Sequence, residues 1–393
     1  MGLLDNLKVI DLSTLFAGPF CATLLGDHGA EVIKIEHPKG DDIRKWGESK
    51  NGIPLWWKVV SRNKKLIAID LHKEIGRNIV KSLVQDADVL IENFRPGKME
   101  QWGLDYNSLR EINKRLIYVK VTGFGNSGPY SKFPGFGTLA EAMSGFAEVT
   151  GFPDGPPTLP AFGLADGVAG IAAAFSVTSA LYKREQTGEG EFIDVSLYEP
   201  LMWIVGAHII EYDQLMKIQG RQGNRSPRTA PRNVYKTLDN RWVALSASAE
   251  SVARRLFQFI GRMDIIEKYP TNTDRIKHID EVDMAVTEWM KLHNQNEIID
   301  LLRDGDIAVA PIYNDEQIYN DLHFQERESI ISLFDEDLGE IRMQGIFPKV
   351  LNYPGKVKYA GRTKIGYNTV EILRKYGYSE ECITKLKNEG VIT

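Results

Sequence analysis

Apolar and polar positions follow two alternating periods along the first half of the chain. Short runs rich in Val, Ile and Leu predict β-strands at residues 8–13, 31–36, 66–71, 89–93 and 116–122. Helical periodicity follows three of them, from Pro19 to Gly29 and over residues 73–86 and 106–114. This alternation predicts an α/β fold with a Rossmann-like doubly wound sheet, helices on both faces and a ligand at the carboxyl ends of the strands.

The rest of the chain predicts further elements of the first domain and then a smaller α/β domain. In the first domain, helices are expected at 139–149, from 167 to about 184 and from 199 to about 215, with a strand at 192–197. Residues 217–233 are rich in Gly, Pro and Arg without periodicity, which is typical of a linker. The remaining elements are expected as hairpin strands at 234–236 and 241–247, helices at 251–260, 282–292 and 297–303, a strand at 307–312, and tail helices at 369–376 and 379–388.

A chain of 393 residues is longer than one hydrophobic core usually holds. We therefore expect a large Rossmann-like domain formed by residues 1–215 and 325–393, and a small domain formed by residues 230–320. The nearly apolar stretch 162–182 is long enough to cross a membrane. It carries Asp166, and a carboxylate inside a bilayer is costly, so a buried helix of a large core is the better interpretation.

Composition narrows the class of protein. The net charge of −5 gives no basic face, so we expect no nucleic-acid partner and no membrane partner. Cys21 and Cys382 are the only cysteines, which indicates a reducing compartment, and the first residues lack a basic stretch followed by an apolar one. We therefore expect a cytoplasmic protein without a signal peptide.

Several familiar motifs are missing from the sequence. No Gly-x-Gly-x-x-Gly follows the first strand, which argues against a nicotinamide oxidoreductase. No Walker loop, Gly-x-Ser-x-Gly elbow or Cys/His cluster with zinc spacing is present, and the histidines are scattered. We expect no metal site and no permanently bound cofactor.

Two loops after predicted strands are candidates for ligand binding. Small residues around Ala17 allow a ligand to approach backbone N–H groups at a helix start, although tight βα turns are common in any such sheet. In the loop after residue 91, Phe94 could stack on an adenine, and Arg95 and Lys98 could meet phosphates. The alternative for this second loop is an ordinary solvated basic segment.

Asp166 stands directly before the long apolar helix. One interpretation is an ordinary N-cap that satisfies free N–H groups. The other is a nucleophile, because a helix start favours an ionised carboxylate and carboxylates form covalent intermediates. The flanking Gly163 and Gly167 would leave room for a thioester and expose N–H groups to an oxyanion.

The order and spacing of several short motifs identify a known family. They are Val9-Ile-Asp-Leu with Ala17-Gly-Pro, Gly29-Ala-Glu-Val-Ile-Lys-Ile-Glu, Asn63-Lys-Lys, Glu92-Asn-Phe-Arg-Pro-Gly, Thr122-Gly-Phe-Gly-Asn-Ser-Gly-Pro and Thr187-Gly-Glu-Gly. With these, the whole chain resembles the class III CoA-transferases, the group of formyl-CoA transferase and carnitine CoA-transferase. The resemblance implies an enzyme that moves coenzyme A, as co-substrate, from an acyl-CoA donor to a carboxylic-acid acceptor.

The resemblance also implies roles for particular residues. Asp166 would be the catalytic aspartate, passing through a mixed anhydride and an aspartyl-CoA thioester. The chain would form an interlocked homodimer, which the linker at 217–233 suits. The residues implied or suggested to contact CoA are Leu15, Phe16, Ala17, His37, Ile69, His72, Asn93, Phe94, Arg95 and Lys98.

The sequence departs from the family pattern around the expected site. Phe16 replaces a frequent glutamine, His37 replaces an arginine that helps to hold the nucleotide, and Gln101, Pro134 and Gly137 replace a basic residue, a lysine and an acid. The glycine-rich flap of formyl-CoA transferase is absent, so formyl-CoA and oxalate are disfavoured, and Phe16 and Phe136 hint at an apolar acyl pocket.

Two alternatives share this fold. α-Methylacyl-CoA racemase carries a His-Asp pair where this chain has Phe136 and Gly137, and phenylalanine cannot transfer a proton. A non-catalytic CoA-binding protein would not need Asp166. Glu141 could face the site or solvent, and the linker arginines, which could bind an acceptor or serve as solvated or interface charges, stay unassigned: Arg221, Arg225, Arg228 and Arg232.

Overall fold

The computed structural model describes residues 2–393 and divides the chain into two compact units. Unit 1 contains the chain up to residue 146 together with residues 159–207 and 322–393, and unit 2 contains residues 147–158 and 208–321. The predicted linker at 217–233 therefore lies inside unit 2. The short segment 147–158, which no sequence feature marked, also belongs to unit 2.

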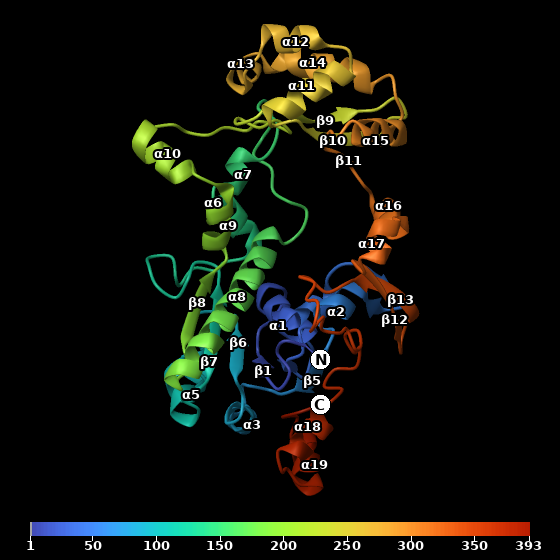
Figure 1. The fold of residues 1–393 in the computed structure, drawn as a ribbon. Coiled ribbons are helices and arrows are strands. Elements are labelled where there is room, and N and C mark those ends of the chain that lie inside the picture. The colour runs from blue at the N-terminus through green and yellow to red at the C-terminus, as the bar shows by residue number, and fades with distance from the viewer. Residues whose placement is uncertain (1) are drawn as a thin grey trace. The chain divides into compact units, whose positions relative to one another are not determined.

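Unit 1 is built on a six-stranded parallel sheet (Figure 1). Its strands are β1 (Lys8–Asp11), β2 (Glu31–Glu36), β5 (Lys64–Ala68), β6 (Val89–Glu92), β7 (Ile117–Thr122) and β8 (Phe192–Ser196). They lie in the order β5-β2-β1-β6-β7-β8. When only the six strands of this sheet are counted along the chain, the order is 3-2-1-4-5-6, which is that of a doubly wound sheet. The order reverses beside β1, so the loops after β1 and β6 diverge there and leave room for a ligand.

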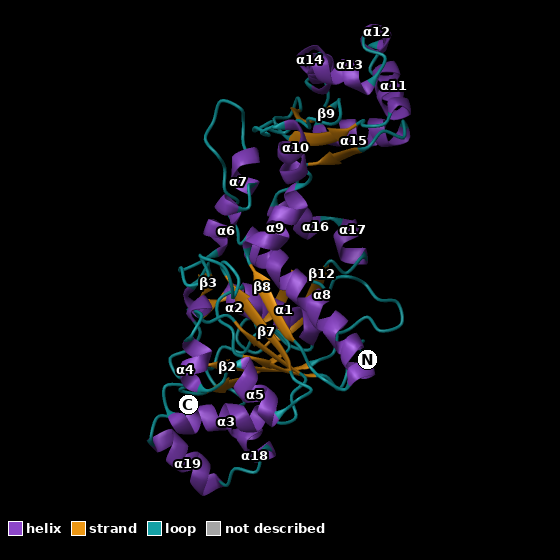
Figure 2. Ribbon diagram, turned by 90° about the vertical axis from the view of Figure 1, so that its left-hand side faces the viewer, coloured by secondary structure: helices purple, strands orange, loops and turns teal. Residues whose placement is uncertain are grey.

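Both faces of this sheet are buried, because successive side chains along each strand point to opposite faces. Ile10, Leu90 and Tyr118 belong to one core, whereas Val9, Ile91 and Val119 belong to the other. The first core is covered by α3 (Glu74–Val84), α5 (Tyr106–Ile112), α18 (Thr369–Lys375) and α19 (Glu380–Asn388). The second core is covered by α1 (Ala17–Asp27) and α8 (Leu164–Thr187). Figure 2 shows the sheet with α1 and α8 on one side and α3 and α5 on the other.

Shorter elements complete unit 1. They are η1 (Asp42–Lys45), α2 (Leu55–Val60), α4 (Lys98–Trp102), α6 (Gly137–Met143), α9 (Tyr198–Val205), α17 (Leu322–Glu326), and the antiparallel pairs β3 (Ser49–Lys50) with β4 (Ile53–Pro54) and β12 (Ile330–Asp335) with β13 (Gly339–Gln344). The chain passes between the units within α7 (Phe146–Val149).

Unit 2 contains a three-stranded antiparallel sheet and a helical layer with its own core. The strands are β9 (Arg232–Lys236), β10 (Trp242–Ser246) and β11 (Val309–Pro311), and Val243 opposite Tyr235 confirms the predicted hairpin. The helices are α10 (His208–Leu215), α11 (Glu250–Phe259), α12 (Met263–Lys268), α13 (Asn272–Lys277), α14 (Ile279–Met290), α15 (Gln295–Asp304) and α16 (Asp315–Asn320).

Three predicted helices differ from the structure at glycines or at their starts. The helix expected at 139–149 is divided at Gly145 (φ 86°), and the helix expected at 199–215 is divided at Gly206 (φ 113°). Both glycines adopt backbone conformations that helices cannot contain. The helix expected from 167 begins earlier, at Leu164.

Only one face of α8 is buried, which corrects the expectation of a wholly buried helix. Small residues on that face, such as Ala169 and Ala173, pack on α1, and a side chain at Gly170 would come within 2.9 Å of the Ala17 carbonyl oxygen. The opposite face leaves Phe175 71% and Tyr182 73% exposed. Within residues 2–393, α8 is the one helix long and apolar enough to cross a membrane by length and composition, with 28% of its most apolar window buried.

Candidate active site

The loop after β1 forms the floor of the candidate site and is anchored by a buried charge network. The Lys64 ammonium lies 2.9 Å from Asp11, and Lys34 lies 2.9 Å from Asp41, all four side chains being almost completely buried. Burial alone would raise the pKa of Asp11, but Lys34 and Lys64 outweigh it and hold this pKa below its usual value. This carboxylate stays ionised and also accepts the Ser13 N–H.

Three strand ends are joined by hydrogen bonds above that network. Thr14 N–H donates to the Asn93 amide oxygen (2.7 Å), and the Asn93 amide donates back to the Thr14 carbonyl oxygen (2.8 Å). The Leu15 N–H donates to Asp41 (3.2 Å). The backbone of Leu15 has φ 64°, which is uncommon for a residue other than glycine. The loops after β1, β2 and β6 are therefore held in one arrangement at the carboxyl edge of the sheet.

Asp166 lies in the first turn of α8 rather than at its N-cap, which Gly163 occupies. The capping interpretation is therefore wrong. Burial, and next the charge of Glu141, raise the pKa of Asp166 to about 6, while its backbone hydrogen bond lowers it. The ionised form still predominates at neutral pH, which agrees with the expectation of an ionised carboxylate at this helix start.

Glu141 faces the same site from α6. It is 2% exposed and accepts the Ala165 N–H at 3.2 Å, in the turn that carries Asp166. The sequence left its orientation open because glutamate is common on solvated helix faces. The structure places two acids together with no cation among the residues that line their cavity.

Asp166 lies where two cavities meet. The larger, about 1050 Å³, is lined mainly by aromatic and aliphatic side chains, and we call it the aromatic cavity. The middle cavity, about 250 Å³, also contains Asp166 and shares Leu15 and Phe136 with the first. An outer cavity, about 170 Å³, shares Thr14 and Phe94 with the middle one. The three therefore form a series of neighbouring cavities, and Asp166 lines both the middle and the aromatic cavity.

The sequence-predicted ligand contacts are distributed along this series. Four line the middle cavity without the outer one, namely Leu15, Ala17, Asn93 and Arg95. Phe94 lines both, and three line the outer cavity alone, namely His37, Ile69 and His72. Phe16 lines the aromatic cavity instead, and Lys98 lies 4.6 Å from the Trp102 ring centroid at the border of the outer cavity.

Glycine at position 137 is a geometric requirement that sequence reasoning missed. A Cβ built there would lie 2.0 Å from Oδ2 of Asp166, so any side chain would displace that carboxylate. An aspartate at position 137, as in the racemase pair, would therefore require the Asp166 side chain to shift from its present position. A Cβ built at Gly163 would lie 3.1 Å from the Phe16 ring, and one built at Gly167 would lie 3.9 Å from it, an ordinary contact. The Gly167 N–H donates to the Gly163 carbonyl oxygen (3.0 Å). The expectation that this N–H is free for an oxyanion is wrong.

One cluster in the outer cavity has donor atoms close enough to hold a metal ion. Among residues 2–393, the side chains of His37, Asp70 and His72 offer ligand atoms within 4.8 Å of one another. His72 Nδ1 lies 3.1 Å from Asp70, and His37 Nδ1 accepts the Lys39 N–H at 3.0 Å. Both Nδ1 atoms thus have partners, and the two histidines line the cavity beside Phe94.

The four arginines of the predicted linker have partners within unit 2. Arg225 pairs with Asp283 (2.7 Å) and Asp280 (2.8 Å), and Arg221 pairs with Glu148 (3.2 Å). Arg228 lies 3.7 Å from Glu211, and Arg232 donates to the backbone carbonyls of residues 224 and 225. Their observed contacts favour the structural interpretation over ligand binding.

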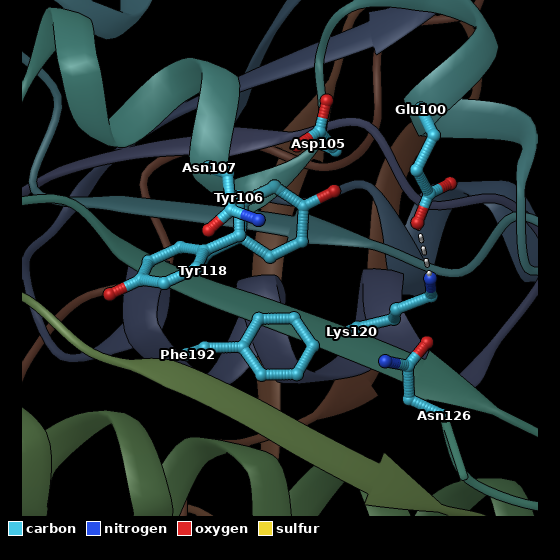
Figure 3. A pocket seen from close by; sticks show the side chains of 8 residues that line it. All are labelled: Glu100, Asp105, Tyr106, Asn107, Tyr118, Lys120, Asn126 and Phe192. Carbon is cyan, nitrogen blue, oxygen red and sulfur yellow. Dashed lines mark ion pairs between the residues drawn. The ribbon is translucent and has the colours of Figure 1, made fainter.

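A separate hollow of about 270 Å³ lies on the opposite face of the sheet (Figure 3). Lys120 pairs there with Glu100 (3.6 Å) and lies 3.9 Å from the buried Glu92, whose pKa burial raises to about 7. Glu92 accepts the Phe94 N–H at 2.7 Å. Glu92 therefore holds the loop of the middle cavity from the opposite face of the sheet. Asp166 is not among the residues that line the hollow.

Comparison with known proteins gives one consistent result. Residues 4–366 match the family described as CoA-transferase family III. The chain is 38% identical to succinyl-CoA–D-citramalate CoA-transferase of Chloroflexus aurantiacus over 99% of this chain and 98% of that protein. It is 32% identical to acetyl-CoA:oxalate CoA-transferase of Acetobacter aceti over 96% and 97%. The crystal structure of a CAIB/BAIF family protein from Brucella suis matches with a TM-score of 0.84 and 28% identity, covering 95% of this chain and 99% of that one.

Proposed function

The chain belongs to CoA-transferase family III and transfers CoA between an acyl-CoA and a carboxylic acid, and from this premise we propose that Asp166 is its nucleophile. The observation that carries the proposal is the position of Asp166 at the junction of the middle and aromatic cavities. A thioester placed there would present its carbonyl to the carboxylate, with CoA on one side and the acyl group on the other. A carboxylate in such surroundings can attack and be acylated.

The proposed reaction transfers CoA in two stages, each through a mixed anhydride at Asp166. Asp166 attacks the donor carbonyl, the C–S bond breaks, and a mixed anhydride and CoA thiolate form. The thiolate attacks the aspartyl carbonyl of the anhydride, which releases the donor as a free carboxylate and leaves an aspartyl-CoA thioester. The acceptor carboxylate attacks this thioester and expels the thiolate, which then attacks the acceptor carbonyl of the second anhydride and regenerates Asp166.

We propose that CoA lies along the outer and middle cavities. Phe94 would contact the base, and the cationic side chains of Arg95 and Lys98 would meet phosphates. His37 and His72 border the outer cavity, where His37 would take the place of the nucleotide-holding arginine. Backbone near Leu15 and Ala17 would then face the pantetheine arm, which is neutral and narrow enough for the middle cavity.

The apolar surfaces of the units support the proposal of an interlocked homodimer. In unit 1, Trp203 on α9 is 82% exposed and Phe175 on α8 is 71% exposed. In unit 2, Ile209 and Leu215 on α10 are 70% and 68% exposed. Patches of this kind mark interaction surfaces. A cytoplasmic location is proposed on the two free cysteines, Cys21 and Cys382.

Trapping the acylated aspartate tests the proposal. Incubation with acyl-CoA but without acceptor, followed by hydroxylamine and peptide mass mapping, should convert Asp166 to a hydroxamate. The Asp166→Asn variant should give no modification, and Asp154→Asn, at an exposed aspartate outside the cavities, should be modified like the unaltered protein. Modification of another residue, or none in an enzyme that still transfers CoA, would contradict the assignment.

A further inference from the structure

We propose that the acyl groups handled at Asp166 are bulky, uncharged hydrocarbon groups, aromatic or branched, rather than short dicarboxylic acyl groups. The inference rests on the proposed function, because it assigns the aromatic cavity to the acyl part of the thioester. Since donor and acceptor would react in turn with the same aspartate, it applies to both acids.

The lining of the aromatic cavity is the first observation that supports this substrate class. Six aromatic side chains contribute to it, namely Phe16, Phe20, Trp46, Trp56, Phe136 and Phe162. The Phe16 ring lies 5.3 Å from the rings of both Phe20 and Trp56, which gives one aromatic wall. Ile171 and Val168 of α8 add an aliphatic surface next to Asp166.

Several of these side chains are unusually exposed for their type. Phe162 is 69%, Phe136 56% and Trp46 47% exposed, although each borders the cavity. Such a large exposed apolar surface favours a ligand that removes it from water, and the favourable free energy of binding grows with the apolar area covered. A two-carbon acyl group would leave most of that surface exposed to water.

The charges of the cavity are the second observation. Its ionisable lining residues are Asp166 and Glu141, and no lysine, arginine or histidine is among the lining residues within 2–393. The distal carboxylate of a succinyl group lies about 5 Å from its reacting carbonyl carbon at ordinary bond lengths, so it would remain inside this cavity. There it would be desolvated beside two acids without a cation, which is unfavourable.

Arg95 does not provide the missing cation. It lines the middle cavity, on the other side of Asp166, and the proposed function places CoA there. An uncharged hydrocarbon group meets no such penalty. This separates the chain from the relatives reported above, whose names specify succinyl-CoA with D-citramalate and acetyl-CoA with oxalate.

The size of the aromatic cavity agrees with a bulky acyl group. A volume of about 1050 Å³ lies at the upper end of the range for ordinary small-molecule sites. Gly163 and Gly167 keep the helix start open beside Asp166, so the wide part of the cavity reaches the carboxylate itself.

A donor and acceptor panel tests the substrate class with the full-length protein. The donors are 3-phenylpropanoyl-CoA, isovaleryl-CoA and succinyl-CoA, each offered with phenylacetate, isovalerate and succinate. We expect kcat/KM for the two hydrocarbon donors to exceed that for succinyl-CoA by at least about tenfold, the scale on which pocket chemistry discriminates substrates. Equal or faster transfer from succinyl-CoA would overturn the inference. No transfer by any pair, with no adduct on Asp166, would instead overturn the proposed function.

A charge-introducing variant sharpens the same test. Phe162→Arg places a cation at an exposed position of the cavity wall and should raise the ratio of succinyl-CoA to isovaleryl-CoA turnover by about tenfold. Leu351→Arg, at a 94% exposed leucine outside the cavity, is the matched control and should leave the ratio unchanged. A folded Phe162→Arg enzyme with an unchanged ratio would contradict the assignment of this cavity to the acyl group.

Discussion

Two carboxylates of unit 1, one buried and one half-buried, have opposite surroundings. Asp11, at the end of β1, has Lys64 at 2.9 Å and Lys34 at 3.9 Å, and its pKa lies below the usual value. Asp166, at the start of α8, shares the aromatic cavity with Glu141 and, within residues 2–393, with no lysine, arginine or histidine, while Arg95 lines only the middle cavity; the pKa of Asp166 is raised to about 6. Both residues are aspartates, one at the end of a strand of the sheet and the other in the first turn of a helix that packs on the same sheet.

The comparison shows how partner charges separate a structural carboxylate from a reactive one. A carboxylate with two ammonium partners is stabilised as an anion, but its lone pairs are engaged and it is a poor nucleophile. A carboxylate without a cation keeps its lone pairs available, and burial makes its charge unfavourable. Acylation removes that charge, so the surroundings of Asp166 favour the proposed covalent intermediate, whereas those of Asp11 oppose one.

The largest expected effect is the loss of activity on replacing Asp166. Asp166→Asn should lower CoA transfer by at least about a thousandfold, because the amide is not a nucleophile. The folded-state pKa of Asp166 is raised, so its ionised form costs stability above about pH 6, and removing the charge should not destabilise the fold at pH 7. Steady-state kinetics and thermal unfolding check both parts. An active variant, or a strongly destabilised one, would contradict this comparison.

The corresponding change at Asp11 should act on stability instead. Asp11→Asn leaves Lys34 and Lys64 buried without their shared anion, and we expect a loss of about 3–5 kcal/mol in the free energy of unfolding. Because the pKa of Asp11 is lowered in the folded state, its contribution is present at neutral pH and is lost as the pH falls below about 4. Urea unfolding at pH 7 measures it, with Asp42→Asn on the exposed side of η1 as control. A variant as stable as the control would show that the network is dispensable.

Replacing Gly137 tests whether the position of the proposed nucleophile matters as much as its charge. Gly137→Ala should lower kcat by about a hundredfold, since its Cβ would displace Oδ2 of Asp166, and misplacement by an ångström has effects of this size. Gly220→Ala, where a Cβ meets nothing within 4 Å, is the matched control. Unaltered kcat in the Gly137 variant would mean that Asp166 tolerates displacement.

Sequence patterns predicted the strands of the parallel sheet because their apolar runs are fully buried and bounded by turn residues. Local motifs also predicted the family, which the family match confirms, and made Asp166 the proposed nucleophile. The β12–β13 pair was missed although its alternating residues carry the signal of a hairpin. The breaks at Gly145 and Gly206 were missed because a glycine inside a periodic segment does not by itself reveal a positive φ.

Electrostatic surroundings could not be predicted in the same way. Lys34, a charged residue of β2, is only 1% exposed because Asp11 and Asp41 pair with it inside unit 1. Glu141 and Gly137 lie on α6 and meet Asp166 only through tertiary packing, 25 and 29 positions away in sequence. What a carboxylate does depends on these distant neighbours, so the sequence indicated the proposed nucleophile but not the cause of its raised pKa.

The smallest expected effect isolates the contribution of Glu141 to that pKa. Glu141→Gln can still accept the Ala165 N–H but removes the negative charge beside Asp166. Since transfer needs ionised Asp166, the acid limb of the kcat/KM profile should lie near pH 6 in the unaltered enzyme and move to lower pH in the variant. Burial is the larger cause and remains, so the shift is partial, and activity at pH 5 should rise by about threefold. Glu148→Gln on α7 should leave the limb in place, and a limb that is unmoved or moved to higher pH by Glu141→Gln would show that this acid does not set the ionisation of the nucleophile.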